Sequence, residues 1–442
     1  MASKQYTPST PPLVLPDLDE SVPEILAGKR ILLVNHSDTL GVAASPSFRL
    51  MQALRRRGLD VRMLVYTRTT SEPTVSSVGS RLVRGLRYTL ERLHIMAATG
   101  LKPDNIFAVS TGSWATNIHH HPWVKEADIV CLNWINQGLM NIEGIRALHR
   151  MGKHIVWTIH DMWPFTGICH HSRQCEYYRD NCGNCMYLRG GGKPGDLSRR
   201  MWEKKQQLFS ELPITFVATS KALEQQARSS SLLRNCAVMT IHAPILVDSF
   251  YTYPAQHIDS LLSITKPNLI LVVSPHLDVS DKSIDTTISA LNTIFDNEPE
   301  LASETAVYLL GHMSDPSKLD ALRMSHRWLG HVNDNNVLRY LYSEAKVVIS
   351  TSMLNDTSIA LIEGMAGGAI PVTFDGLPCD DVIEHMVNGY NAAAGSADDL
   401  ARGISWALSA DIDRDSQHEH VKAIYSPDAV AQSYIDLFAQ LL

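Results

Sequence analysis

The sequence has no apolar run of about 18 residues, the length that an α-helix needs to cross a bilayer, so we expect no membrane span. Its start, MASKQYTPSTPPLVLPDLDESVPE, has no basic stretch followed by an apolar core, so we expect no secretory signal peptide. Residues 1–28 are instead predicted to be a mobile lead-in rich in proline and serine. Positive charge is not in excess either. The net charge of −7 gives no electrostatic case for nucleic-acid binding.

The cysteines do not have the pattern of a disulfide framework. There are seven, an odd number, and four of them are crowded into one short segment, which is more typical of a reducing compartment. Apolar residues make up 45% of the chain and charged residues 19%, as in an ordinary soluble globular protein. A chain of 442 residues is too long for one ordinary core. We therefore expect a cytoplasmic α/β protein with about two domains.

Short apolar runs alternate with helical patterns in both halves of the chain. This alternation predicts parallel, doubly wound sheets. A polar segment, 252–266, separates two such sets, so the predicted domains are 29–250 and 264–424, followed by an amphipathic helix at 425–442. The predicted strands are 29–34, 61–66, 128–132, 154–159, 214–218 and 238–241 in the first domain, and 269–273, 307–310, 346–350 and 370–374 in the second.

Two loops of the first domain carry polar or glycine residues at predicted strand ends, where open α/β sheets bind ligands. His160, Asp161 and Trp163 follow the strand 154–159, in the segment WTIHDMWPFTG. Gly41 follows the first strand. A single glycine suits either a tight turn or a turn that presents backbone N–H groups to an anion, and both interpretations stay open.

The segment 169–185 is a cysteine-rich insertion with the spacing C-x5-C-x6-C-x2-C. Its last pair forms a CxxC turn, which lets two thiolates reach one tetrahedral ion. A structural zinc is one interpretation; two disulfides or four free thiols are the others, with the reducing compartment against disulfides. Four thiolates would close the coordination shell, so such a zinc would not be catalytic. The predicted ligands are Cys169, Cys175, Cys182 and Cys185, with His170 and His171 as substitutes.

In the second domain, Glu363 is predicted to open a helix that ends at Gly367 and Gly368. A carboxylate and backbone N–H groups at a helix start suit a ribose hydroxyl and a diphosphate. His276 and Lys282, one loop apart, could bring positive charge to the same phosphates. Each residue alone could be a helix-end charge or a solvated side chain. Together they favour a nucleotide site.

The segment 81–96 predicts a basic amphipathic helix. Its leucines recur at helical spacing, and four arginines accompany one acid, Glu91. Such a helix can lie on an anionic membrane surface, or it can be a solvated helix packed on its own domain. Both interpretations stay open. The leucines are Leu82, Leu86, Leu90 and Leu93, and the arginines are Arg81, Arg84, Arg87 and Arg92.

Several longer motifs resemble one known family. They are LNWINQG, WTIHDMWPFTGICHH with its CGNC ending, IHAPILVDSF, LIEGMAGGAIPV and YSPDAVAQSYIDLF. From residue 29 to its end the chain resembles glycosyltransferase family 4, and within it the bacterial colanic-acid and capsule-type enzymes. The resemblance implies the GT-B fold: two facing Rossmann-like domains and a closing helix that crosses back to the first domain.

The resemblance also implies an activity: transfer of a hexose-type sugar from a nucleotide-sugar donor to a glycan or lipid-linked acceptor, with retention, in surface polysaccharide synthesis. No divalent ion or other cofactor is expected for catalysis. By position, Glu363 matches the glutamate that holds the donor ribose, Lys282 the lysine on the diphosphate, and His160 the histidine at the reaction centre. The remaining donor-side residues are Gly364 and Gly367, and the acceptor-side residues are Gly41, Trp134, Asn136, Asp161 and Trp163.

Three positions depart from the family pattern. Asn355 stands where the family has the first of two glutamates, His276 where it has an arginine, and Val42 where it has a second glycine. Each lost charge-assisted contact is worth ~1.5–3 kcal/mol, so donor binding could be much weaker. A non-catalytic glycosyltransferase-like binding subunit is therefore the alternative function. A nucleotide-sugar epimerase of the same fold is a further one, but of the first-domain groups only Asp161 could be its catalytic carboxylate.

Overall fold

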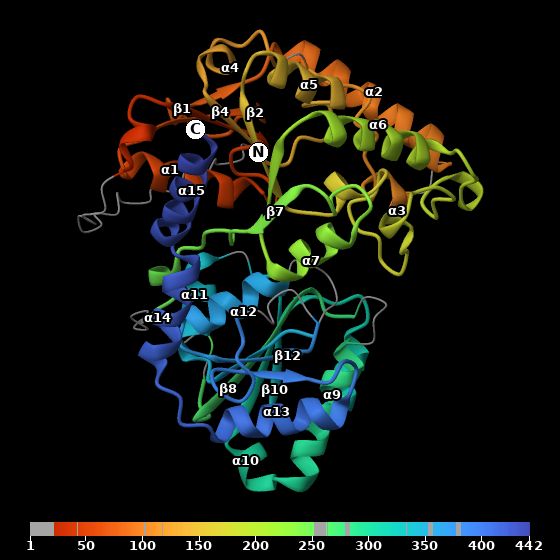
Figure 1. Cartoon of the computed structure of the whole chain (residues 1–442). Coiled ribbons are helices and arrows are strands. Elements are labelled where there is room, and N and C mark those ends of the chain that lie inside the picture. The colour runs from red at the N-terminus through yellow and green to blue at the C-terminus, as the bar shows by residue number, and fades with distance from the viewer. Residues whose placement is uncertain are drawn as a thin grey trace, which may run out of the picture.

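The computed structural model describes residues 22–41, 43–100, 103–116, 118–251, 262, 264–278, 283–332, 334–351, 357–376 and 382–442. These residues form two α/β domains, drawn one above the other in Figure 1. Each domain has its own parallel sheet with helices on both faces. The prediction of two doubly wound domains is confirmed.

The first domain is built on a seven-stranded sheet with the order β3-β2-β1-β4-β5-β6-β7, and every pairing is parallel. Its central strands are almost continuous apolar runs, because helices cover both faces. The strands are β1 (Arg30–Ser37), β2 (Asp60–Thr67), β3 (Val75–Ser77), β4 (Ile129–Leu132), β5 (His154–Ile159), β6 (Ile214–Ala218) and β7 (Ala237–Thr240).

The helices of this domain begin where side chains can cap them. Ser80, Asn141, Asp196 and Ser220 each accept a hydrogen bond from a backbone N–H of the first turn that has no partner within the helix. The helices are α1 (Ala44–Arg56), α2 (Arg81–Thr99), α3 (Pro103–Ile106), α4 (Pro122–Glu126), α5 (Ile142–Arg150), α6 (Leu197–Glu211) and α7 (Lys221–Ser229).

The second domain has a six-stranded parallel sheet with the order β10-β9-β8-β11-β12-β13. The short strands β3, β10 and β13 were not predicted, because none is an apolar run. The strands are β8 (Asn268–His276), β9 (Thr305–His312), β10 (His326–Gly330), β11 (Val347–Ile349), β12 (Ile370–Phe374) and β13 (Tyr390–Ala392). The helices are α9 (Ser283–Asn297), α10 (Pro299–Ser303), α11 (Asn335–Glu344), α12 (Thr357–Ala366), α13 (Ala397–Ser409), α14 (Arg414–Tyr425) and α15 (Pro427–Leu441).

The last helix, α15, returns to the first domain and packs on α1 (Figure 1). Its Tyr434 hydroxyl lies 2.8 Å from Thr158 Oγ1 on β5. Ile435 and Phe438 are fully buried in the core between α1 and the sheet. The end of the chain is therefore part of the first domain's core.

In each sheet the strand order reverses beside the first strand, between β1 and β4 and between β8 and β11. Ligands of doubly wound sheets bind at the carboxyl ends of the strands at such a switch point.

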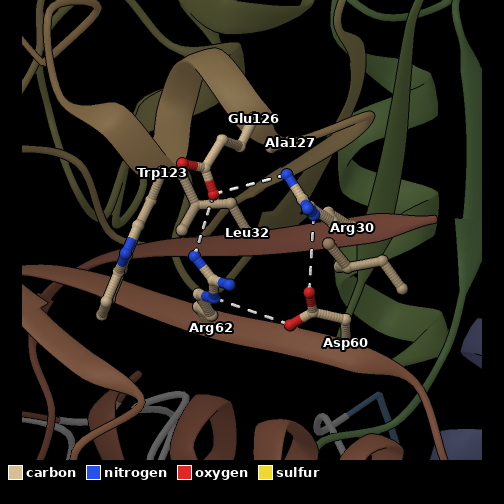
Figure 2. A pocket seen from close by; sticks show the side chains of 8 residues that line it. Arg30, Leu32, Asp60, Arg62, Trp123, Glu126 and Ala127 are labelled. Carbon is tan, nitrogen blue, oxygen red and sulfur yellow. Dashed lines mark hydrogen bonds and ion pairs between the residues drawn. The ribbon is translucent and has the colours of Figure 1, made fainter. Parts of the chain in front are cut away.

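The opposite edge of the first sheet, at the amino ends of its strands, carries a network of ion pairs. There Arg30 and Arg62 bridge Asp60 and Glu126 at N–O distances of 3.1–3.6 Å (Figure 2). The two arginines and the two acids at this edge balance one another's charge, so a ligand site is expected at the opposite, carboxyl edge.

Within the described residues, no helix combines the length and the apolar character that a membrane crossing needs.

Candidate active site

The switch point of the first sheet gathers aromatic and polar side chains. His36, near the end of β1, stacks on Tyr66 with ring centroids 4.9 Å apart, and meets the edge of Trp134 at 5.5 Å. Burial lowers the pKa of His36 to about 4, although its hydrogen bond with the carbonyl of Asn136 acts in the opposite direction. The imidazole is therefore neutral at pH 7. His36 was not predicted as a site residue.

Asp161 connects this group to the loop after β5. Its Oδ2 accepts hydrogen bonds from the indole N–H of Trp134 and from His170 Nδ1, both at 2.7 Å. Its Oδ1 accepts from the backbone N–H of Trp163 at 2.8 Å. Burial alone would raise the pKa of Asp161, but His170 and these hydrogen bonds lower it to about 2. The carboxylate is ionised and fixes the orientation of Trp134.

His160, beside it, is held by a neutral partner. Its Nε2 lies 3.1 Å from Asn133 Oδ1, and the amide nitrogen of Asn133 donates to the carbonyl of Cys131. That second bond orients the amide, so Nε2 of His160 carries the proton and Nδ1 is left as an acceptor. Burial lowers the pKa of His160 to about 4, which keeps the ring neutral at pH 7.

Ser110, His170 and Asp161 have the connectivity of a Ser-His-Asp triad. Ser110 Oγ lies 2.9 Å from His170 Nε2, and His170 Nδ1 lies 2.7 Å from Asp161. Ser110 is completely buried, however, so no substrate can reach its hydroxyl. The carbonyl of Ser110 also accepts the indole N–H of Trp163 at 2.9 Å. We therefore infer that Ser110 and His170 position Asp161, and that Ser110 is not a catalytic nucleophile.

These residues line a small hollow of about 190 Å³, counted to its open mouth. Trp134 and His160 are partly exposed there, whereas Trp163 is only 1% exposed. The ring of Trp163 packs in the core beneath the hollow, and its predicted contact with an acceptor stays a prediction. The lining residues are Asn133, Trp134, Ile135, Asn136, Trp157, Thr158, His160, Asp161, Trp163 and Pro164.

One polar atom in this lining has no partner. Asn136 Oδ1 is buried and, within the described residues, accepts no hydrogen bond. A buried acceptor without a donor costs about 1–3 kcal/mol, which a ligand donor could recover. The next residue, Gln137, has a φ of +56°, which is uncommon for a residue other than glycine. Such features often mark a ligand-binding loop.

Gly41 lies on the same edge, in the loop between β1 and α1. Its φ is +94°, and a Cβ built there would meet no atom within 4 Å. The glycine is thus needed for the backbone conformation and leaves open space above it. Asp38, earlier in this loop, accepts hydrogen bonds from the backbone N–H groups of Thr69 and Thr70 at 2.9 Å. The loop is anchored to the end of β2.

Donor-side residues are divided between described and undescribed parts of the chain. Lys282 and Asn355 lie outside the described residues, so their predicted roles stay predictions. His276 is exposed at the carboxyl end of β8, and its ring centroid lies 5.6 Å from that of His312. His276 is thus on the edge of the second sheet where a ligand is expected.

The structure corrects the predicted position of Glu363. Helix α12 begins at Thr357, so Glu363 lies in the second half of the helix and does not open it. It is partly buried, beside Tyr342 of α11 and Arg49 of α1. Burial raises the pKa of Glu363 to about 7, against the influence of Arg49 and of the hydrogen bond with Tyr342. Arg49 belongs to the first domain, so the two domains come close together here.

The glycines after Glu363 are also not at a helix start. A Cβ at Gly364 would lie 2.5 Å from Val348 Cγ1, and one at Gly367 would lie 2.5 Å from the carbonyl oxygen of Tyr342. The N–H of Gly367 is already bonded to the carbonyl of Glu363 at 3.0 Å. Their predicted position at a helix start is therefore wrong, and their predicted role in donor binding stays a prediction. They let α12 pack closely on its neighbours and then end.

The four cysteines of the insertion lie near one another, and Cys185, Cys182 and Cys175 add to the rise in the pKa of the Cys169 thiol. Burial is the larger cause, and it raises the pKa of Cys182 and of Cys185 to about 11. Among the described residues, no group of three or more His, Cys, Asp or Glu side chains is arranged to hold a metal ion. The geometry thus gives the zinc prediction no support, and metal content itself is untested.

A buried cation lies next to this cluster. Lys205 Nζ is 3.6 Å from the ring centroid of Trp163 and donates to the carbonyls of Trp163, Thr166 and Gly167. Burial lowers the pKa of Lys205 to about 7, although Cys182 and Cys169 act in the opposite direction. Lys205 thereby holds together the loop that carries Asp161 and Trp163. No local pattern around Lys205 predicts this role.

Comparison with known proteins agrees with this architecture. Residues 257–424 match the family model "Glycosyl transferases group 1". A glycosyltransferase from Rickettsia africae has 12% identity and a TM-score of 0.61, covering 94% of this chain and 99% of its own. HepE from Anabaena, solved with UDP-glucose, has 12% identity and a TM-score of 0.55, covering 93% of this chain and 99% of its own.

Sucrose-phosphate synthase from Thermosynechococcus elongatus has 15% identity and a TM-score of 0.61, covering 93% of this chain and 99% of its own. No curated protein sequence is similar enough to count as a match. Identities this low show the shared fold alone. Residues 257–424 thus have the sequence pattern of group 1 glycosyltransferases, and the two domains together have the fold of solved glycosyltransferases.

Proposed function

We propose that this chain is a retaining glycosyltransferase acting from the cytoplasm. It would transfer a hexose-type sugar from a nucleotide-sugar donor to a glycan or lipid-linked acceptor in surface polysaccharide synthesis. The observation that carries this proposal is the match of residues 257–424, the second domain, to group 1 glycosyltransferases. HepE, which has the same fold, was solved with UDP and with UDP-glucose.

In this proposal the donor diphosphate lies at the carboxyl edge of the second sheet. The amino end of α12, at Thr357, follows β11 on that edge, and free backbone N–H groups at a helix start favour an anion. Lys282 would add a positive charge, and Glu363 would hold the ribose. Charge that develops on the leaving diphosphate would then be stabilised by protein groups.

The first domain would present the acceptor and position the donor sugar. His160 is neutral, so it would act through its Nδ1 as a hydrogen-bond acceptor and not as a cation. The unpartnered Asn136 Oδ1 would accept a sugar hydroxyl. Asp161 would hold Trp134 as one wall of the hollow. Closure of the two domains would exclude water from the donor.

The test begins with a thermal-shift screen of nucleotide sugars, followed by analysis of the product and its anomeric configuration. His160→Gln is expected to lower kcat roughly 100-fold with little change in donor affinity, as for a group acting mainly in the transition state. The matched control is His154→Gln, an exposed histidine at the other end of β5. Equal losses in both variants would contradict the role of His160.

Glu363→Gln is expected to weaken donor binding about tenfold, because a charged acceptor for the ribose hydroxyls is lost. Glu384→Gln, an exposed glutamate of the same domain, is the control and is expected to bind normally. Unchanged donor affinity in Glu363→Gln would remove Glu363 from the donor site. No binding of any nucleotide sugar by the wild-type chain would reject the transferase proposal itself.

The alternative is a glycosyltransferase-like subunit that binds a glycan or a partner without turnover. It is favoured by His276, which is exposed where the family has an arginine, and by the raised pKa of Glu363. The subunit would bind glycan but neither bind nor hydrolyse a nucleotide sugar. Calorimetric titration with donors, together with a donor-hydrolysis assay, separates the two functions.

A further inference from the structure

Helix α2 is amphipathic, but its apolar face is exposed and does not pack on the core of its own domain. Leu82, Leu86 and Leu93 are 86%, 59% and 54% exposed. Their spacing of four and seven residues puts them on one stripe of the helix. The opposite face buries Glu91 and Ile95. A helix packed only for its own domain would have the reverse arrangement.

A neighbouring side chain enlarges the apolar surface. Phe107, just after α3, is 66% exposed. It lies beside α2, because the Arg92 guanidinium is 5.5 Å from the Phe107 ring centroid and 5.6 Å from that of Tyr88. Figure 1 places α2 on the outer side of the first domain, away from the second. This surface therefore does not serve the contact between the domains.

The charge around this surface has one sign. Arg81 and Arg87 lie on either side of the leucine stripe, about 120° from it around the helix, and neither has a carboxylate partner within the described part of the chain. Arg84 lies on the opposite face and donates to the carbonyls of Val78 and Gly79. The one acid of the helix, Glu91, is completely buried. A second copy of this chain would bring arginines toward arginines with no acid on either helix to pair with them. Anionic lipid headgroups over an apolar layer fit both features.

The buried face of α2 connects this surface to the candidate active site. Glu91 Oε1 accepts the backbone N–H groups of Thr111 and Gly112 at 2.9 and 3.2 Å. A Cβ at Gly112 would lie 3.0 Å from the ring of Trp163. On the same helix, the backbone at Tyr88 closely approaches Gly138 of the loop that carries Trp134 and Asn136.

We propose that the outer face of α2, with Leu82, Leu86, Leu93 and Phe107 inserted and Arg81 and Arg87 at the headgroups, docks the chain on an anionic membrane surface. Docking would bring the hollow at Trp134 and Asn136 to a fixed position near the bilayer. A lipid-linked acceptor could then reach the hollow without leaving the membrane. Docking itself does not depend on the proposed sugar transfer.

The test is co-flotation of the purified full-length chain with vesicles. One set contains phosphatidylcholine alone and the other about 30% phosphatidylglycerol. The wild-type chain is expected to bind the anionic vesicles roughly tenfold or more tightly, and less tightly at high salt. Leu86→Gln with Leu93→Gln is expected to weaken binding roughly tenfold, because two inserted apolar side chains are lost.

The matched control is Ile25→Gln with Val387→Gln, two exposed apolar residues elsewhere on the chain, which are expected to bind vesicles like the wild type. Circular dichroism checks that all variants are folded. Wild-type binding that is absent, equal for both vesicle types, or unchanged in the α2 variant would overturn the proposal. So would light scattering that shows a dimer dissociated by the same substitutions. Because no sugar donor is present, failure here is distinct from failure of the transferase.

Discussion

At the residue scale, the loop after β5 shows which part of a candidate site a local sequence pattern can predict. Asp161 and His160 were predicted because polar residues end an apolar strand, which is a local pattern. The partners that fix Asp161 are not local. Trp134 lies 27 residues before it, and Ser110 lies 60 residues before His170. No periodicity connects such positions, so the sequence could suggest Asp161 but not the group around it.

Asp161→Asn is expected to destabilise the folded chain by about 2 kcal/mol at pH 7. The folded-state pKa of Asp161, about 2, is below its usual 3.8, so its carboxylate stabilises the fold above pH 3.8. That contribution is lost as the pH falls from 3.8 to 2. Urea unfolding at several pH values measures it.

The control for this prediction is Asp180→Asn, an exposed acid of the same loop region. It is expected to change the free energy of unfolding by less than about 0.5 kcal/mol. If Asp161→Asn had an effect equally small at pH 7, the hydrogen bonds around Asp161 would not contribute as described.

Glu363 is expected to have the opposite dependence on pH. Its folded-state pKa, about 7, is above its usual 4.5, so the folded state prefers the protonated acid. Its stabilising effect is complete below pH 4.5 and is lost as the pH rises to about 7. Between pH 5 and 7.5 the wild-type chain should lose about 1–3 kcal/mol relative to Glu363→Gln.

Urea unfolding of both proteins across that range checks this expectation, with Glu384→Gln as the exposed control. Parallel curves for wild type and Glu363→Gln would mean that the carboxyl group is ionised in the fold as it is in water.

At the element scale, helix α12 shows why the sequence predicted the end of a helix correctly and its start wrongly. The motif LIEGMAGGAIPV was correctly predicted to contain a helix that ends at Gly367 and Gly368. The start was placed too late, at Glu363, although Asp356, a residue type favoured at N-caps, directly precedes Thr357 in the sequence. The glycines were then assigned to phosphates, although they serve close packing. The end of this helix is marked by Gly368 in the left-handed conformation. Its start had a weaker signal, the aspartate at position 356, which the sequence prediction did not use.

Gly364→Ala is therefore expected to destabilise the second domain by about 1–3 kcal/mol, because the new Cβ would collide with Val348. Gly85→Ala, in α2 with open space around it, is the control and is expected to be neutral or to stabilise by about 0.5–1 kcal/mol. Adding Val348→Ala should recover part of the loss. Thermal unfolding measures all three variants, and a neutral Gly364→Ala would contradict the packing role.

For the cysteine insertion, the zinc prediction still calls for measurement. If the sequence prediction is right, metal analysis of the purified chain gives about one zinc per chain, the amount for a single tetrahedral site. Cys182→Ser with Cys185→Ser should abolish it, and Cys236→Ser, a cysteine outside the insertion, should not. A zinc-free, fully folded preparation would reject the prediction and leave Lys205 as the main support of this loop.

At the scale of the whole molecule, the sequence predicted the two parallel sheets but not the residues through which the two domains contact each other. Alternating apolar runs are sufficient to predict parallel sheets, because each unit is about 30 residues of local pattern. The approach of Arg49 to Glu363 joins a helix of the first domain to one of the second. Such a contact depends on how the domains pack, which no local pattern encodes.

Phe438→Ala is expected to destabilise the first domain by about 3–5 kcal/mol, although Phe438 is far from that domain in the sequence, in α15. The reason is that Phe438 is completely buried in the core between α1 and the sheet. Gln440→Ala, exposed on the same helix, should change the free energy of unfolding by less than about 0.5 kcal/mol. Denaturant unfolding followed by tryptophan fluorescence compares them; similar values would mean that α15 is only loosely attached.

The return of α15 to the first domain has a consequence for biosynthesis. The ribosome makes β1 and α1 long before Phe438, so the apolar side of the nascent first domain lacks the layer formed by α15 until the second domain has been made. A truncated product would therefore expose this surface of the amino-terminal half, whereas the carboxyl-terminal half would keep its own core intact.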